Sequence, residues 1–299
     1  MLHIFYHKPD CDGHCSGYLA QLYNQGKEDY TLTAYDYDMP FPEEVLQNLG
    51  QNDKAYFLDI VPKPYERLYE LSLVKKNQII VIDHHKTWIE SGYASFFPGK
   101  SEIGKAGCEL AWEYFFPTEP MPRFIKLLGR YDVWDKSDQT LWNEVILPFQ
   151  YGMRLSSTHP KKRGDAIWDV LFYNSNPEDN NVDDIIRNGK ICLQYQDKIN
   201  RSIMNDYSFD ATFSGYRALC VNANIRNSQL FESKWDSSKY DIMLAYTHKK
   251  GADFSVSIYT TPETGIDVSD IAKKYGGGGH KNASGLLLSY PQLKEALGI

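Results

Sequence analysis

The sequence has few cysteines and no long apolar run. Its five cysteines are an odd number without the spacing of a disulfide framework, so we expect free thiols in a reducing, cytoplasmic compartment. No apolar stretch approaches the roughly 20 residues that a transmembrane helix needs. His7, Lys8 and Pro9 follow the first apolar residues too early for a signal peptide. We therefore expect neither secretion nor contact with a membrane.

The chain also lacks an excess of basic residues. It has 32 Lys and Arg against 39 Asp and Glu, which gives a formal net charge of −7. Proteins that hold a long nucleic acid usually present clustered Lys and Arg, so a long duplex is not an expected partner. A hydrophobic fraction of 42% and a charged fraction of 24% are typical of globular proteins. A chain of 299 residues can form two cores, and we expect two domains.

Short β-type runs alternate with helical segments in the first half of the chain. We expect strands at 2–6, 30–35, 55–60 and 79–82, with helices that include 17–24, 65–75 and part of 104–155. This alternation predicts an α/β fold whose mostly parallel sheet is doubly wound, with helices on both faces. The run from Ile79 to Ile82 is continuously apolar and β-branched, as expected of a central strand.

The predicted domain organisation follows from a change of composition. The segment 173–181 is rich in turn-forming residues and precedes a helical run. We therefore expect a catalytic domain at 1–180, a linker helix at 181–206 and a second, smaller α/β domain at 207–299. In that second domain we expect strands at 218–221, 241–246 and 254–259, a helix at 268–275 and then a Gly-rich turn.

Carboxylates and histidines fall where the predicted strands end. These residues follow the first strand (His7, Asp10 and Asp12), the third (Asp59) and the fourth (Asp83, His84 and His85), and one lies in a helical segment (Asp132). In an open parallel sheet, side chains just past the carboxyl ends of strands converge on one crevice, which is where such folds bind ligands. Carboxylate oxygens with imidazole nitrogens and no thiolate suit Mn²⁺, Mg²⁺ or Fe²⁺ better than a structural zinc.

Each of these residues alone has a simpler explanation. A single Asp after a strand is more often a helix cap than a ligand, but their joint occurrence favours a metal site. Two adjacent histidines after a buried apolar strand would be costly if they were buried without partners, and metal ligation removes that difficulty. Cys11, His14 and Cys15 are close enough for a zinc site, yet they interleave with the acidic motif and lack a second ligand pair.

Five segments, in order along nearly the whole chain, resemble the motifs of the DHH phosphoesterase superfamily. The triplet Asp83-His84-His85 matches the motif that names the superfamily, and His7-Lys8-Pro9-Asp10-Cys11-Asp12 matches its first motif. The single aspartates Asp59 and Asp132 match two further motifs. The segment 275–285 resembles the Gly-rich signature of the substrate-binding domain that accompanies many members.

The resemblance implies a site for two divalent cations, with Mn²⁺ favoured over Mg²⁺ or Fe²⁺. One cation would be held by His7, Asp10 and Asp59, and the other by Asp12, Asp59, His84 and Asp132. Asp59 would bridge them. His85 would face the scissile phosphate, and Asp83 would orient its neighbours. The nucleotide would be contacted by Gly277, Gly278, Gly279 and His280, because glycines let main-chain N–H groups approach a phosphate closely.

The implied activity is that of a metal-dependent phosphoesterase. By resemblance, the expected function is a phosphodiesterase or exonuclease that hydrolyses short oligonucleotides or linear dinucleotides to nucleoside monophosphates. A cyclic-dinucleotide phosphodiesterase, a 3′-phosphoadenosine 5′-phosphate phosphatase and a catalytically silent nucleotide-binding protein are the alternatives. RNA and DNA are both candidate substrates, and a homodimer is possible.

Two observations bear on how the substrate is held. Many relatives carry an arginine in a Ser-x-Arg-Ser pattern before the Gly-rich segment, whereas this chain reads Ser257-Ile258-Tyr259-Thr260. We therefore expect this chain to bind its substrate through different contacts. The aromatic residues Tyr131, Trp134 and Tyr259 are candidates for stacking on a base.

Overall fold

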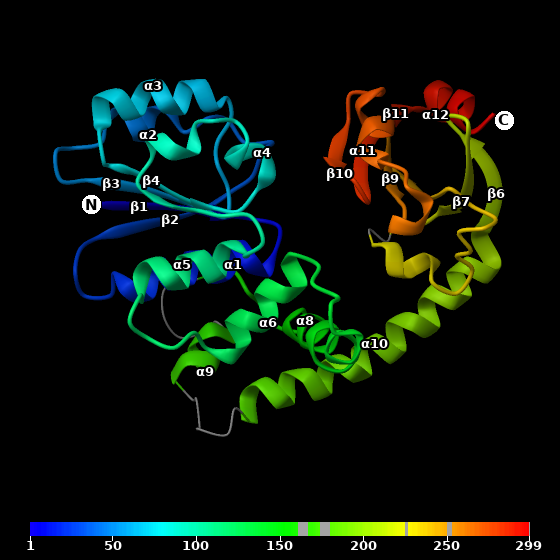
Figure 1. The fold of residues 1–299 in the computed structure, drawn as a ribbon, viewed down its shortest axis with the longest axis horizontal. Helices are drawn as coiled ribbons and strands as arrows, with labels where there is room; N and C mark the ends of the chain where they lie inside the picture. Colours follow the sequence, from blue (N-terminus) through cyan, green and yellow to red (C-terminus); the bar gives the residue numbers. More distant parts are fainter. Residues whose placement is uncertain (161–166, 174–179, 225–226, 250–252, 299) are drawn as a thin grey trace. The chain divides into compact units, whose positions relative to one another are not determined.

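The chain forms two units in the computed structural model, which describes residues 1–160, 167–173, 180–224, 227–249 and 253–298 (Figure 1). The units are Met1–Leu193 and Gln194–Ile299, and the boundary falls inside one helix, α10 (Asn180–Tyr207). The expected linker helix is thus part of α10. The turn-rich segment that we expected to connect the domains lies mostly outside the described residues. Among the described helices, none is long and apolar enough to cross a bilayer.

The first unit is built on a five-stranded sheet that is parallel throughout. Its strand order is β2-β1-β3-β4-β5. The strands are β1 (Leu2–His7), β2 (Tyr30–Tyr35), β3 (Lys54–Leu58), β4 (Ile79–Asp83) and β5 (Gly99–Ser101). The chain reverses its direction across the sheet at β1 and β3, and a crevice forms at the carboxyl ends of strands on either side of such a point.

Helices cover both faces of this sheet, as predicted for a doubly wound fold (Figure 1). One face carries α1 (Cys11–Tyr23), α5 (Gly107–Phe115) and α6 (Arg123–Asp132), and the other carries α2 (Glu43–Gln47), α3 (Tyr65–Lys75) and α4 (Lys86–Ile89). Successive residues of β1 point to opposite faces, so Ile4 and Tyr6 join one core while Phe5 joins the other. The short helices α7 (Gln139–Leu141), α8 (Leu147–Met153) and α9 (Ile167–Tyr173) also belong to this unit.

Two element boundaries differ from the sequence prediction for local reasons. The first helix begins at Cys11 instead of residue 17, because the Asp10 side chain caps it by accepting a hydrogen bond of 2.9 Å from the main-chain N–H of Gly13. The third strand ends at Leu58 instead of residue 60, because Asp59 adopts a positive φ of 58° that an extended strand does not allow. Both differences involve predicted metal ligands.

The second unit contains a six-stranded mixed sheet of order β10-β11-β9-β8-β7-β6. Its strands are β6 (Ser208–Phe213), β7 (Tyr216–Asn222), β8 (Ile242–His248), β9 (Asp253–Tyr259), β10 (Gly278–His280) and β11 (Ala283–Ser289), with helices α11 (Val268–Lys273) and α12 (Tyr290–Leu297). In β11, Leu286 and Leu288 are buried and Leu287 is exposed, the alternation of a strand with one covered face. The prediction missed β6, β10 and β11, and part of the expected Gly-rich turn is the edge strand β10.

Candidate metal centre

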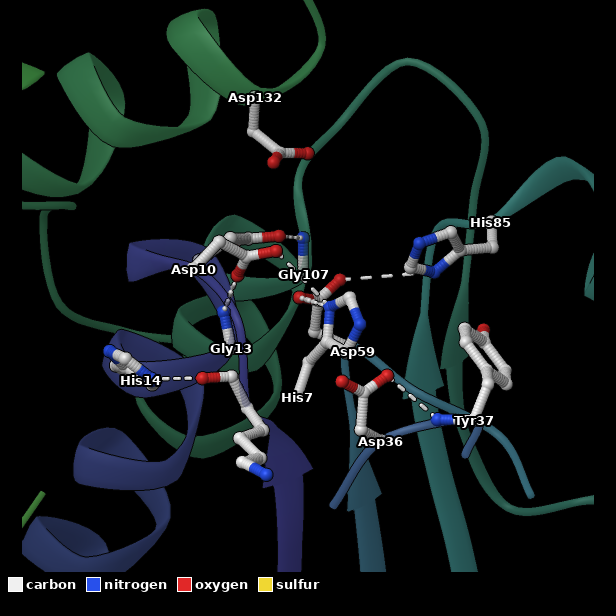
Figure 2. A network of polar contacts seen from close by, with 12 residues as sticks. His7, Asp10, Gly13, His14, Asp36, Tyr37, Asp59, His85, Gly107 and Asp132 are labelled. Atoms are coloured by element: carbon white, nitrogen blue, oxygen red, sulfur yellow. Dashed lines mark hydrogen bonds and ion pairs between the residues drawn. The ribbon is translucent and has the colours of Figure 1, made fainter. Parts of the chain in front are cut away.

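The carboxylates and histidines singled out in the sequence meet at the carboxyl ends of three neighbouring strands (Figure 2). His7 is the last residue of β1, Asp59 directly follows β3, and Asp83 is the last residue of β4. Asp132 reaches the same place from the end of α6. The parallel topology therefore brings together residues that are far apart in the sequence, at the position where α/β sheets bind ligands.

The ligand atoms form two groups, and within each group they lie within 4.8 Å of one another. The first group is His7, Asp59 and His85. The second group is Asp12, His84 and Asp132. The predicted ligand Asp10 lies beside the first group, with its Oδ2 3.2 Å from Nδ1 of His7. Its other oxygen caps α1. The structure thus assembles all the expected ligands, and it also brings His85 into the first group.

Asp59 belongs to the first group, also reaches His84 of the second, and is 1% exposed. Its Oδ2 is 3.2 Å from Nδ1 of His7, and its Oδ1 is 3.2 Å from Nε2 of His84. Oδ1 is buried and has no hydrogen-bond partner among the described residues. A buried carboxylate oxygen without such a partner is costly unless something else neutralises it. A cation would do so, and the position of Asp59 is the one expected of a bridging ligand.

Asp12 is held in place by the first turn of α5. Its Oδ2 accepts a hydrogen bond of 2.8 Å from the N–H of Gly107, and its Oδ1 accepts one of 2.6 Å from the N–H of Cys108. These are N–H groups that a helix leaves without an internal partner. The sequence analysis missed both donors, because they come from the main chain and no motif marks them.

Two glycines allow this close packing. A Cβ atom at Gly107 would lie 2.6 Å from Cβ of Asp59, and one at Gly13 would lie 2.2 Å from the main-chain oxygen of His7. Real Cβ atoms do not approach other atoms so closely, so a side chain at either position would displace a predicted ligand. Both glycines therefore belong to the architecture of the site.

The electrostatics of the site fit a pair of cations. Burial, and then the charge of Asp12, raise the pKa of Asp59 well above its usual range. Burial and the charges of Asp12 and Asp59 do the same to the pKa of Asp132. Burial alone would lower the pKa of His7, but hydrogen bonds with Asp10 and Asp59 outweigh it and raise that pKa to about 11. Carboxylates crowded together in this way repel one another and tend to take up protons. Divalent cations bound between them would remove that repulsion.

Asp83 and His85 form a short hydrogen bond within the site. Asp83 is fully buried, and its Oδ1 accepts a hydrogen bond of 2.7 Å from Nδ1 of His85. Burial would lower the pKa of His85, but this bond and the Asp83 charge outweigh it and raise that pKa. Because Nδ1 is engaged, Nε2 is the nitrogen that can meet an ion or a substrate. The arrangement fits the orienting role expected of Asp83.

The predicted aromatic residues differ in their availability. Trp134 is 45% exposed and has a positive φ of 58°, and its ring lies edge-on to Tyr131 and Trp142 at centroid distances of 5.6 and 5.0 Å. Tyr259 is buried in the second unit and contacts Phe231, so its ring is not available to stack on a base. Trp134 lies two residues after Asp132 in the chain.

His14 is engaged within the protein. Its Nε2 lies 2.7 Å from the main-chain oxygen of Lys8, and its Nδ1 lies 2.7 Å from Oγ1 of Thr158. Both ring nitrogens of His14 therefore have partners within the protein.

Close packing explains why two positions of the Gly-rich segment are glycine. A Cβ atom at Gly277 would lie 2.3 Å from the main-chain oxygen of Gly285, and one at Gly279 would lie 2.6 Å from that of Ala283. These glycines let β10 pair closely with β11. Gly278 faces open space and has no such requirement. The side chain of His280 lies outside the described part of the structure.

Two solved structures share this fold. The pGpG-specific phosphodiesterase PggH from Vibrio cholerae matches with a TM-score of 0.51 at 10% sequence identity, over 98% of this chain and 95% of that one. The DHH domain of a member of a family of ribosomal proteins matches with a TM-score of 0.59 at 14% identity, over 99% of this chain and 85% of that one. This chain shares the fold of both structures, and the residues singled out in the sequence converge on one site.

A curated relative identifies the family more narrowly. The uncharacterized protein R106 of Acanthamoeba polyphaga mimivirus is 30% identical over an alignment of 315 residues, which spans 96% of this chain and 67% of R106. No protein-family model matches the chain. The chain belongs to the same protein family as R106.

Proposed function

We propose that the protein is a two-metal phosphodiesterase that hydrolyses short oligonucleotides or linear dinucleotides to nucleoside monophosphates. The observation that carries this proposal is the buried carboxylate of Asp59, which belongs to one group of metal-ligating atoms, lies 3.2 Å from His84 of the other, and has one oxygen without a hydrogen-bond partner among the described residues. Paired divalent sites of this kind are used to cleave phosphate esters.

The residues that would hold the cations are those that the superfamily motifs indicate. His7, Asp10 and Asp59 would bind one ion, and Asp12, Asp59, His84 and Asp132 the other. Donors that are only oxygen and imidazole nitrogen suit Mn²⁺, Mg²⁺ or Fe²⁺, and Mn²⁺ is the proposed metal because the sequence motifs resemble those of the DHH superfamily. When bound, such ions lower the pKa of water and neutralise charge on a phosphate. His85 lies in the same group of metal-ligating atoms as His7 and Asp59, which makes it an additional candidate ligand.

The other residues of the site would position these ligands and the substrate. Asp83 fixes the ring of His85, so that Nε2 can donate a hydrogen bond to the phosphate. The first turn of α5 fixes both oxygens of Asp12. Trp134 would stack on a base next to the scissile phosphate, because its ring is held out to solvent by a strained backbone two residues after Asp132.

Charge and fold support a short substrate. A chain of net charge −7 does not present the clustered Lys and Arg that track a long phosphate backbone. The matched structure from Vibrio cholerae is described as specific for pGpG, a linear dinucleotide. We therefore favour linear dinucleotides over cyclic ones and over 3′-phosphoadenosine 5′-phosphate. The Gly-rich segment of the second unit, with Gly278 open to its surroundings and His280 beside it, would bind the far end of the nucleotide.

The test is a substrate panel with metal analysis. Protein prepared with Mn²⁺ is analysed by mass spectrometry for metal content, and then incubated with linear and cyclic dinucleotides, labelled longer strands and phosphoadenosine phosphate. We expect two equivalents of metal and fastest turnover of linear dinucleotides. Two equivalents with no turnover of any substrate, or nucleotide binding without metal, would identify a silent nucleotide-binding protein instead.

A further inference from the structure

Tyr37 and Lys63, near the candidate metal centre, belong to none of the segments that resemble superfamily motifs. Tyr37 follows β2, and its ring centroid is 6.0 Å from that of His7 and 6.5 Å from that of His85 (Figure 2). Lys63 follows β3, and its Nζ lies 4.9 Å from the centroid of Tyr37. Lys63 thus contacts a ring that itself lies beside two of the histidines of the site.

The ammonium group of Lys63 is held by aromatic rings instead of by an acid. It lies over the face of Tyr37 and also 5.7 Å from the ring centroid of Tyr65, which are distances at which a cation is attracted to an aromatic face. Within the described parts of the chain, no carboxylate forms an ion pair with it. By contrast, Lys100 and Lys105 of the same unit both pair with Glu113. Lys63 therefore keeps its hydrogen-bond donors available to a ligand.

The charge balance of the site explains why such a lysine would matter. Four of the proposed metal ligands are carboxylates (Asp10, Asp12, Asp59 and Asp132), and two divalent cations carry four positive charges. The carboxylates would therefore offset the cations, which leaves little net positive charge for a substrate with more than one phosphate. An ammonium group beside the site would supply it, because charge-assisted hydrogen bonds to phosphate are among the stronger polar contacts.

We propose that Lys63, seated on the ring of Tyr37, binds a second phosphate group of the substrate, one that is not cleaved. This inference rests on the proposed function, and it makes the preferred substrate a dinucleotide with a terminal phosphate. The 5′ and 3′ ends of a dinucleotide offer the same chemistry, and both are therefore tested.

The experiment compares three substrates that differ only in their terminal phosphates: a dinucleoside monophosphate, its 5′-phosphorylated form and its 3′-phosphorylated form. The variants are Lys63→Ala and Lys126→Ala, where Lys126 is an exposed lysine of α6. For one of the phosphorylated substrates we expect Lys63→Ala to raise KM by about tenfold, the loss typical of a charge-assisted hydrogen bond. We expect its kcat, its metal content and its KM for the unphosphorylated substrate to stay within about twofold of wild type, as should every parameter of Lys126→Ala.

An equal change in KM for all three substrates, or no change for any, would overturn the role of Lys63. If the wild-type protein with metal hydrolyses none of them, the proposed function fails, and the same compounds are then compared by isothermal titration calorimetry. A preference for a terminal phosphate that is lost in Lys63→Ala supports the inference even then, and the absence of any preference refutes it.

Discussion

Replacement of Asp59 by Asn is expected to stabilise the metal-free protein while it abolishes activity. The pKa of Asp59 is raised by burial and by the charge of Asp12, so the ionised carboxylate costs free energy in the folded state at neutral pH. An amide of the same shape removes that charge. Asn also tolerates the positive φ of 58° at this position.

The expected gain in stability comes from removing the unfavourable charge of Asp59. Such replacements commonly gain about 1 kcal/mol, which corresponds to a rise of about 2–4 °C in Tm for a unit of this size. The gain should depend on pH with a definite sign. Below the ordinary pKa of an aspartate, near 4, the carboxyl is protonated in both the folded and unfolded states and the gain vanishes. As the pH rises above that value, the wild-type protein loses stability and the gain appears.

The assay is thermal unfolding of chelator-treated protein at pH 4 and pH 7, together with turnover at saturating Mn²⁺. Asp59→Ala is the matched variant, because it also removes the charge. Alanine lacks the polar side chain that helps Asn to adopt a positive φ, so this conformation costs it about 1 kcal/mol or more. We expect Asp59→Asn to be the more stable of the two. A lower Tm for Asp59→Asn than for wild type at pH 7 would refute the electrostatic cost of the Asp59 charge, and retention of more than about 5% of wild-type turnover where a bridging ligand is lost would refute the bridging role.

Three further predictions concern the metals, the packing of the site and the base. Metal binding should release protons, because the pKa of His7 is raised to about 11 without metal and its proton must leave before it can act as a ligand. Mn²⁺ affinity should therefore rise between pH 6 and pH 8, which calorimetry in buffers of different ionisation enthalpy measures. Gly107→Ala should lower both metal occupancy and stability, the latter by about 1–3 kcal/mol, since the new Cβ would lie 2.6 Å from that of Asp59, whereas Gly278→Ala meets open space and should not. Trp134→Ala should raise KM for dinucleotides by roughly 5- to 100-fold and leave hydrolysis of bis(p-nitrophenyl) phosphate unchanged, and an equal loss on both substrates would remove the base-stacking role.

The sequence predicts the first unit well because its signals are local. Continuous apolar runs mark β1, β3 and β4, and the carboxylates and histidines stand directly at their ends, so the parallel topology alone is enough to bring His7, Asp59 and His84 together.

What the sequence does not predict depends on contacts between distant segments. The N–H groups of Gly107 and Cys108 hold Asp12 only because α5 lies against α1, and the main chain of α5 carries no motif. The approach of His85 to Asp59 and the positive φ of Asp59 are likewise set by packing. In the second unit, the strands β10 and β11 are short or Gly-containing, and they form because they pair with each other and with β9.

The proposed function is tested most directly by the dependence of kcat/KM on strand length for the Mn²⁺-loaded protein. With a 5′-labelled series of single strands at two salt concentrations, we expect activity to peak at about two to five nucleotides and the log–log salt slope to be about −1 to −2, because few phosphates meet a lysine or arginine. A site that cleaves short substrates should then lose efficiency steadily as the strand grows. A rise in kcat/KM beyond about ten nucleotides, or a slope steeper than about −4, would instead indicate a basic channel and a processive exonuclease.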